Sequence, residues 1–259
     1  MEDGSINNKV KLSILRACEE YELIESGDKI MVGLSGGKDS LTLVHFLSQM
    51  AERLNHSFKV IAAHIRFTNL PYAIDADYLS NFCKERNVEY HLIEDQIRDG
   101  HMGNGTCLHC SRFRRAKLME LARVFQCNKL SLGHHLDDIV ATLLMNMTQH
   151  GRFAGMAVKL NITVGDEKYP LQIIRPLALT SEQSIIDFVT ATGMQPVKCR
   201  CPWGDTGVRK KTRSVVDNIA QALGEDARIN IFKSQFNVSP KRIFREKTMD
   251  IEDIGAQLK

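Results

Sequence analysis

The sequence of 259 residues lacks any run of about 18 consecutive apolar residues, which is the length that a membrane-spanning helix requires. Its first residues, MEDGSINNKVK, also lack the basic stretch followed by an apolar run that is typical of a secretory signal. Both absences predict a cytoplasmic protein with no membrane partner.

An excess of charge of one sign is missing too, because 34 Lys and Arg residues are balanced by 31 Asp and Glu residues, for a net charge of +3. A protein that binds nucleic acid over its whole surface carries more positive charge, so any RNA contact must use local basic patches. Each such patch could instead be a solvated helix face. Three patches are present: Arg112, Arg114, Arg115 and Lys117; Arg209, Lys210, Lys211 and Arg213; and Lys241, Arg242, Arg245 and Lys247.

The composition also lacks the signs of disorder, since 43% of the residues are hydrophobic and 25% are charged. A chain of this size can bury a full core and form one large domain with small appendages. We expect three parts: an N-terminal helix over residues 1–26, a central domain over residues 27–200 that carries a cysteine-bearing insertion, and a basic helical region over residues 201–259.

Short apolar runs that alternate with helical patterns predict an α/β fold. KIMVGL, residues 29–34, is an apolar run before a glycine turn, which is typical of a buried parallel strand. Further strands are expected at residues 58–65 and 88–94, before the glycine at 133, and at residues 173–177. Helices are expected over residues 8–25, 39–54, 74–86 and 111–125, then up to residue 147, and from Ser181 onward. This rhythm predicts right-handed crossovers and a doubly wound parallel sheet.

The first expected strand runs directly into SGGKDS, residues 35–40, and then into a helix. This order surrounds the turn with backbone N–H groups and the positive end of a helix dipole, which together favour a phosphate. Gly36 and Gly37 let the backbone approach closely, Lys38 adds a positive charge, and the hydroxyls of Ser35 and Ser40 can donate hydrogen bonds.

The loop does not match the Walker pattern of P-loop kinases and GTPases. Only three residues separate Gly33 from Gly37, and Asp39 rather than Ser or Thr follows Lys38. An acidic residue beside phosphates is best explained by a metal ion that shields it, so we expect Asp39 to help bind Mg²⁺.

A second polar motif, GHHLDD at residues 133–138, follows the strand expected before it. Ligands of doubly wound sheets bind at the carboxyl ends of the strands, so this motif should face the same crevice as SGGKDS. Asp138, and with it Asp137, could complete the metal site or orient the α-phosphate. His134 and His135 could contribute to the site or could simply cap and pack a helix.

Four of the seven cysteines form two groups, CLHC at residues 107–110 and CRC at residues 199–201. Structural disulfides are rare in the cytoplasm, so the grouped cysteines favour a soft metal or an iron–sulfur cluster. A zinc site with four thiolates stays open, although its usual second motif would be CxxC. The glycine-rich stretch at residues 95–110 is interpreted as a functional insertion. Cys18, Cys83 and Cys127 lie in apolar contexts and are expected to be core thiols.

SGGKDS after a strand resembles the phosphate loop of the N-type ATP pyrophosphatases, which cleave ATP between the α and β phosphates and transfer AMP. The order SGGKDS, CxxC with SRFRRAKL, LGHHLDD, IRPL and a late cysteine before a basic helix resembles the tRNA 2-thiocytidine synthetase family and its 2-thiouridine relatives. The likeness spans about Lys29 to Arg213. No zinc-finger cysteines precede the first helix, which favours the thiocytidine branch.

The resemblance implies a doubly wound sheet of the adenine nucleotide alpha hydrolase-like (PP-loop ATPase) type, with a 4Fe-4S cluster and Mg²⁺ as cofactors. Three cysteines would bind the cluster and leave one iron open for sulfide: Cys107, Cys110 and Cys201. Cys201 is preferred to Cys199 because Pro and an aromatic residue follow it, as in relatives. The catalytic residues implied are Lys38, Asp39 and Asp138. The ATP-binding residues implied are Gly33, Leu34, Ser35, Gly36, Gly37, Lys38, Asp39, Ser40, His64 and Gly133.

The predicted function is ATP-dependent tRNA thiolation, in which a pyrimidine C2 oxygen, preferably that of cytidine, is adenylated and then replaced by sulfur. The partners implied are tRNA, ATP and a sulfur donor such as a cysteine desulfurase, and a homodimer is left open. RNA binding is assigned to Arg112, Arg114, Arg115 and Lys117, beside the expected cluster. Three alternatives stay open: an amidating or lysine-ligating synthetase with the same loop, thiolation of uridine, and a non-enzymatic metal or RNA binding module.

Overall fold

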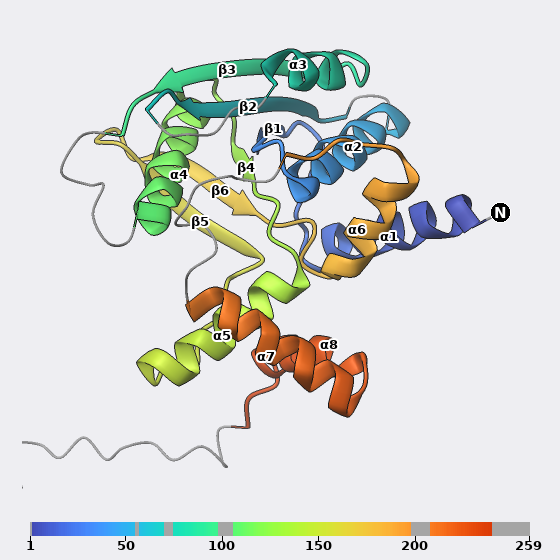
Figure 1. Cartoon of the computed structure of the whole chain (residues 1–259). Coiled ribbons are helices and arrows are strands. Elements are labelled where there is room, and N and C mark those ends of the chain that lie inside the picture. Colours follow the sequence, from blue (N-terminus) through green and yellow to red (C-terminus); the bar gives the residue numbers. More distant parts are fainter. Residues whose placement is uncertain (1, 55–56, 70–74, 98–105, 198–207, 240–259) are drawn as a thin grey trace, which may run out of the picture.

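The computed structural model describes residues 2–54, 57–69, 75–97, 106–197 and 208–239 (Figure 1). Strands and helices alternate through most of this length, as the sequence predicts. The elements are α1 (Glu2–Glu20), β1 (Lys29–Gly33), α2 (Lys38–Arg53), β2 (Lys59–Phe67), α3 (Ala76–Lys84), β3 (Glu89–Asp95), α4 (Thr106–Val124), β4 (Lys129–Ser131), α5 (Leu136–His150), β5 (Lys159–Val164), β6 (Tyr169–Ile174), α6 (Glu182–Ala191), α7 (Val208–Leu223) and α8 (Asp226–Ser234).

The strands form one sheet in the order β3-β2-β1-β4-β6-β5. β1 pairs in parallel with β2 on one side and with β4 on the other, so the chain reverses its direction of travel across the sheet between these two strands. This reversal is the topological switch point at which doubly wound sheets bind ligands. The predicted α/β class is confirmed.

The sheet is mixed rather than wholly parallel, because β5 pairs antiparallel with β6 at one edge. The sequence did not lead us to expect β5. The two strands form a hairpin whose turn contains Gly165 in the left-handed region, at φ +70°. β6 also ends earlier than the strand expected at residues 173–177, since Ile174 is its last paired residue and Pro176 cannot donate a ladder hydrogen bond.

The sheet buries both of its faces. In β1, Ile30 and Val32 point to a core that α1, α2 and α6 cover, whereas Met31 points to a second core beneath α4. Figure 1 shows α4 on one side of the sheet and α2 and α6 on the other. This double burial explains why the β1 sequence is continuously apolar instead of alternating.

Helices α5, α7 and α8 pack together below the sheet in the view of Figure 1. Phe232 of α8 is buried in the main core and makes an edge contact with the ring of Tyr21, at 6.4 Å between centroids. The helices after residue 201 therefore add to the hydrophobic core, whereas the sequence analysis identified them only as basic. The basic patch at Lys241 to Lys247 lies outside the described residues.

Helix boundaries differ from the expectations mainly in α1 and α4. α1 begins at Glu2 rather than near residue 8. α4 begins at Thr106 rather than at residue 111, so the CLHC motif belongs to the first turns of the helix and not to the insertion that precedes it. Ser181 caps α6 as expected, because its Oγ accepts a hydrogen bond from the backbone N–H of Ser184. None of the described helices is long and apolar enough to cross a membrane.

Candidate active site at the carboxyl edge of the sheet

A cavity of about 600 Å³ opens where β1 and β4 end, at the switch point of the sheet. Both sequence motifs contribute to its wall, together with α4 and α7. The lining residues are Gly33, Ser35, Asp39, Ser40, Ser111, Arg114, Arg115, Leu118, Leu132, Gly133, His134, Asp138, Lys210 and Arg213. The predicted meeting of SGGKDS and GHHLDD in one crevice is confirmed by this geometry.

The SGGKDS loop is fixed by its own serines. The Oγ of Ser40 donates to the carbonyl of Gly37 at 3.0 Å and accepts from the backbone N–H of Ser35 at 3.1 Å. Gly36 adopts φ +76°, a conformation that side chains disfavour, and its carbonyl accepts from the N–H of Val197 at 2.9 Å. The loop therefore turns directly from β1 into the N-terminus of α2, which favours an anion.

Two carboxylates bind the ammonium group of Lys38. Its Nζ lies 2.9 Å from Oδ1 of Asp39 and 2.8 Å from Oε1 of Glu182, the first residue of α6. Burial alone would lower the pKa of Lys38, but the two carboxylates outweigh it and the pKa is raised. Lys38 is therefore charged and lies beside Asp39, which lines the cavity.

The two loops touch at Gly133. A Cβ atom built there would lie 3.2 to 3.3 Å from the backbone carbon and Cβ of Asp39 and from the N of Ser40, so a side chain would force the loops apart. This close approach brings Asp39 within reach of the start of α5. His135, the N-cap residue of α5, lies 3.9 Å from Asp39 and 3.4 Å from Asp138, measured from its Nε2.

Six ionisable side chains close into a ring at this edge, which we call the charge ring: Lys38, Asp39, His135, Asp138, Arg213 and Glu182. Going round it, Arg213 forms an ion pair with Asp138 and lies 3.6 Å from Glu182, which returns to Lys38. Acidic and basic groups alternate, so each charge has a neighbour of opposite sign on both sides.

His135 is fully buried within the charge ring. Burial would lower its pKa, but Asp137, Asp138 and Asp39 outweigh burial and the pKa is raised. Asp137 lies outside the ring, where its carboxylate accepts from the N–H of Glu182 at 2.7 Å and pairs with Nε of Arg228 at 2.8 Å. It connects α5 to α6 and α8, so its role is structural. The sequence left both roles of His135 open, and the structure gives it both: it caps α5 and touches the site.

His64 lies in β2 beside the loop but does not line the cavity. Its ring is buried, and Nδ1 donates to the carbonyl of Leu34 at 2.7 Å. Burial lowers its pKa, so the ring is neutral and carries its hydrogen on Nδ1. The ring therefore fixes the first residue after β1.

The helix α4 presents a basic face to the same cavity. Ser111, Arg114, Arg115 and Leu118 line it, at the spacing of one helix face. Arg112 is exposed away from this face. Lys117 pairs with Asp95 at 3.3 Å and Glu120 at 3.6 Å. Of the four residues assigned to RNA, the structure brings two to the cavity and leaves two outside it.

The cysteines separate into two groups. Cys18, Cys83 and Cys127 are buried in the core, and burial raises the pKa of each thiol, to about 12, 12 and 11, as expected for inert core thiols. Cys110 is half-buried on α4, one residue before the cavity-lining Ser111, and Cys107 lies one turn earlier in the same helix. Cys199 and Cys201 lie outside the described residues. Among the described residues, no three His, Cys, Asp or Glu side chains gather as a metal site.

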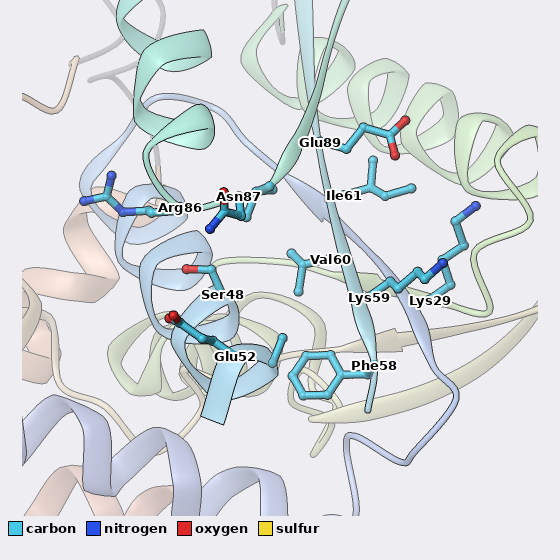
Figure 2. Close-up of a pocket in the computed structure, with 12 residues that line it drawn as sticks. Lys29, Ser48, Glu52, Phe58, Lys59, Val60, Ile61, Arg86, Asn87 and Glu89 are labelled. Atoms are coloured by element: carbon cyan, nitrogen blue, oxygen red, sulfur yellow. The ribbon is translucent and has the colours of Figure 1, made fainter. Parts of the chain in front are cut away.

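A second hollow, of about 350 Å³, opens at the opposite edge of the sheet. Figure 2 shows its lining side chains, which include Lys29, Lys59 and Glu89 from the first residues of three strands and Glu52 from the end of α2. Helix C-termini carry partial negative charge, so this edge lacks the helix N-termini that favour phosphate at the other edge. The hollow has charged residues but no phosphate cradle.

Glu182 and Arg213 are the site residues that sequence reasoning missed. Glu182 looks like an ordinary acidic residue in the first turn of a helix, and no local signal marks it. Arg213 was noted only as part of a basic patch. Both reach the site through tertiary packing, since α6 and α7 are distant from the two motifs in sequence.

The model of the PP-loop domain family matches residues 6–198 of this chain. The tRNA-cytidine(32) 2-sulfurtransferase 1 of Francisella tularensis is 32% identical over 266 residues, which cover 98% of this chain and 96% of that protein. This chain belongs to the PP-loop tRNA-cytidine 2-sulfurtransferase family. Another member, from Syntrophotalea carbinolica, is 32% identical over 257 residues and covers 96% of each chain. The recognition drawn from the motifs is thereby confirmed.

Among solved structures, the U34-tRNA thiolase NcsA from Methanococcus maripaludis, solved with its 4Fe-4S cluster, superposes with a TM-score of 0.72. The two proteins share 20% identity, over 95% of this chain and 82% of that one. This likeness shows that the 2-sulfurtransferase family member described here has the fold of a PP-loop thiolase.

Proposed function

We propose that this chain is an ATP-dependent transferase that adenylates the C2 oxygen of a cytidine in tRNA and replaces it with sulfur. The observation that carries the proposal is the cavity at the carboxyl edge. It brings the phosphate loop, Asp138 and the arginines that follow CLHC to one place. A nucleotide, a nucleobase and a sulfur source must meet in such a reaction, and holding them in alignment can supply about 7 to 11 kcal/mol of the barrier.

The chain's own residues would act on ATP as follows. The turn at Gly36 and Gly37 and the N-terminus of α2 bind the phosphates, and Lys38 stabilises the charge that develops on departing pyrophosphate. Asp138, at the start of α5, faces the same cavity and orients the α-phosphate for attack by the base oxygen. The proposed nucleotide site is completed by Gly33, Leu34, Ser35, Ser40, His64 and Gly133.

Asp39 fits the role of a Mg²⁺ ligand. Its carboxylate lies at the cavity, about a quarter of the side chain is exposed, and carboxylate oxygens are the ligands that Mg²⁺ prefers. Since Mg²⁺ usually takes one or two protein carboxylates together with substrate phosphates and water, a single Asp beside the phosphate loop suffices. A bound Mg²⁺ would offset the repulsion between Asp39 and the phosphates.

The thiolates of Cys107, Cys110 and Cys201 are the proposed cluster ligands, with Cys199 as the alternative to Cys201. Cys110 lies on α4 next to the cavity wall. The chain enters the stretch with Cys199 and Cys201 from Val197, which is bonded to the phosphate loop, and leaves it at α7, whose Lys210 lines the cavity. A 4Fe-4S cluster held by three cysteines would supply sulfide at its open iron.

A tRNA must present an unstacked base to this cavity, so the substrate is a loop nucleotide held through its phosphates. Arg114 and Arg115 fit this task best, because both line the cavity. Arg112 and Lys117 lie outside it and would contact more distant phosphates. The proposal includes a sulfur donor such as a cysteine desulfurase, and it places the reaction in the cytoplasm.

The test is mass spectrometry of tRNA nucleosides from cells with and without this protein. The proposal expects 2-thiocytidine to disappear when the protein is removed and to return with the intact gene. Loss of a thiolated uridine instead would show that the substrate base is uridine and not cytidine. Loss of an amidated or lysine-bearing nucleoside, with no iron in the purified protein, would establish a different synthetase. Unchanged nucleosides together with no tRNA-dependent AMP formation would overturn the enzyme itself.

A further inference from the structure

Arg213 lies at the proposed ATP site although it comes from a helix beyond the part of the chain that the PP-loop family model matches, which ends at residue 198. Its guanidinium forms an ion pair with Asp138, and its Nη1 lies 3.6 Å from Oε2 of Glu182. It also lines the cavity together with Ser35, Asp39 and Ser40 of the phosphate loop. A cation is therefore held in place beside the loop.

Arg228 shows what a purely structural arginine looks like in the same helical group. It pairs with Asp137, Asp217 and Glu225 at 2.7 to 2.8 Å, it does not line the cavity, and only 14% of its side chain is exposed. The side chain of Arg213 is 35% exposed and faces the cavity. Arg228 already ties the C-terminal helices to α5, so the position of Arg213 requires another explanation.

Glu182 links Arg213 to Lys38. Its Oε1 lies 2.8 Å from Nζ of Lys38, and its Oε2 faces the guanidinium of Arg213. One carboxylate thus bridges two cations at the mouth of the phosphate loop. Pyrophosphate has several negative oxygens and can bridge the same two cations more strongly, because the guanidinium fork matches phosphate oxygens in pairs.

We propose that Arg213 binds the pyrophosphate portion of ATP together with Lys38. This role rests on the adenylation reaction proposed above. In that step the base oxygen forms a bond to the α-phosphorus, the bond from that phosphorus to the bridging oxygen breaks, and the electron pair stays on the departing pyrophosphate. Arg213 stabilises this added charge, and Glu182 is a positioning residue that keeps both cations beside the phosphate loop before ATP arrives.

The experiment measures binding of inorganic pyrophosphate and of AMP to the full-length protein by titration calorimetry in the presence of Mg²⁺. Arg213→Ala should weaken pyrophosphate binding about tenfold, or about 1.4 kcal/mol, and leave AMP binding within about twofold. Arg213→Lys, which keeps the charge but loses the fork, should weaken it by about threefold. The matched control is Lys233→Ala, which removes one exposed charge from α8 and should change neither affinity.

Thermal unfolding of each variant distinguishes loss of binding from loss of the fold. If Arg213→Ala does not fold, the pyrophosphate affinity of Arg213→Lys tests the role of Arg213. Unchanged pyrophosphate affinity in Arg213→Ala, or an equal loss of AMP affinity, would overturn the role of Arg213. A wild-type protein that forms AMP from ATP and tRNA while Arg213→Ala binds pyrophosphate normally would refute this inference alone. A wild-type protein that forms no AMP would refute the proposed function first.

Discussion

The two edges of the sheet use the same kinds of residue in opposite ways. At the amino edge, Lys129 and Asp28 form an ion pair of 2.8 Å, with side chains only 5% and 4% exposed. Lys129 also donates to the carbonyl of Leu23, and Asp28 accepts from the side chain of Asn128. At the carboxyl edge, Lys38 pairs with Asp39 at a similar distance, but both side chains remain about a quarter exposed, and Asp39 lines the cavity.

The difference lies in what surrounds each pair. The amino-edge pair is enclosed by protein groups that satisfy it, so it can do no more than hold the segment between α1 and β1 against β4. The carboxyl-edge pair lies where α2, α5 and α6 begin, and the positive ends of three helices favour an anion from outside. The comparison teaches that burial and helix direction, more than residue type, distinguish the structural ion pair from the pair at the proposed binding site.

The largest difference between the two edges should appear when cysteines are substituted. Cys201→Ala should lose both the cluster and thiolation activity, whereas Cys199→Ala should keep a substantial share of each. Cys127→Ala, which changes a buried residue just before β4, should keep both, because the thiol of Cys127 has a raised pKa of about 11 and stays protonated. Iron and sulfide analysis of each variant measures the cluster, and a tRNA thiolation assay measures the activity. Loss in Cys199→Ala alone would move the third ligand to Cys199.

Breaking the buried pair at the amino edge should cost stability and not nucleotide affinity. Lys129→Met leaves Asp28 buried without its cation, which typically costs about 3 to 5 kcal/mol. The exposed Lys59→Met should cost less than about 0.5 kcal/mol. Urea unfolding measures both. A stable Lys129→Met protein that no longer binds ATP would reverse the roles given to the two edges.

Substitutions at the carboxyl edge should do the opposite. Lys38→Ala or Asp39→Ala should lower AMP formation by about 100- to 1000-fold, as removal of a group that stabilises developing charge typically does. The fold and the iron content should be retained, because both side chains are partly exposed. Release of AMP and pyrophosphate gives the rate, with Lys59→Ala as the control. Either variant releasing both products near the wild-type rate would place adenylation elsewhere.

A smaller, pH-dependent effect should come from His45, near the amino-edge hollow. Burial, and then Arg86, lower the pKa of His45 to about 4, and Nε of Arg86 donates to its Nδ1. As the pH falls below 6.5, His45 takes up a proton in the unfolded chain but stays neutral in the folded chain until about pH 4. The contribution of His45 to the free energy of unfolding is therefore highest above pH 6.5 and falls between pH 6.5 and pH 4. The stability difference between wild type and His45→Phe should therefore shrink on acidification. A difference that stays constant by urea unfolding would contradict the assignment.

The parts of this structure that could be predicted are those whose signals are adjacent in sequence. The apolar run of β1, the glycines of the loop and the start of α2 follow one another, so their geometry could be derived from local rules. GHHLDD was placed in the same crevice because parallel strands end at one edge. β5 was missed because its residues are only half-buried or exposed at a sheet edge and form no apolar run, although the Gly-Asp turn after it was a usable hairpin signal.

Long-range ion pairs could not be predicted. No residue near Glu182 in the sequence indicates that it will contact Lys38. Likewise, no local signal distinguishes Arg213 from Lys211, which lies two residues earlier in α7 and is exposed. Those contacts depend on how α6 and α7 pack, which no local pattern specifies. The sequence was therefore sufficient to locate the loop and to predict its chemistry, while the charge ring required the tertiary structure.

The most direct test of the account is to follow the oxygen of the base. A tRNA whose target cytidine carries ¹⁸O at C2 would be incubated with ATP, a sulfide source and the cluster-loaded protein, and the AMP would be analysed by mass spectrometry. If the base oxygen attacks the α-phosphorus, each 2-thiocytidine formed should release one AMP that carries the label. Thiolation accompanied by unlabelled AMP would contradict adenylation of the base.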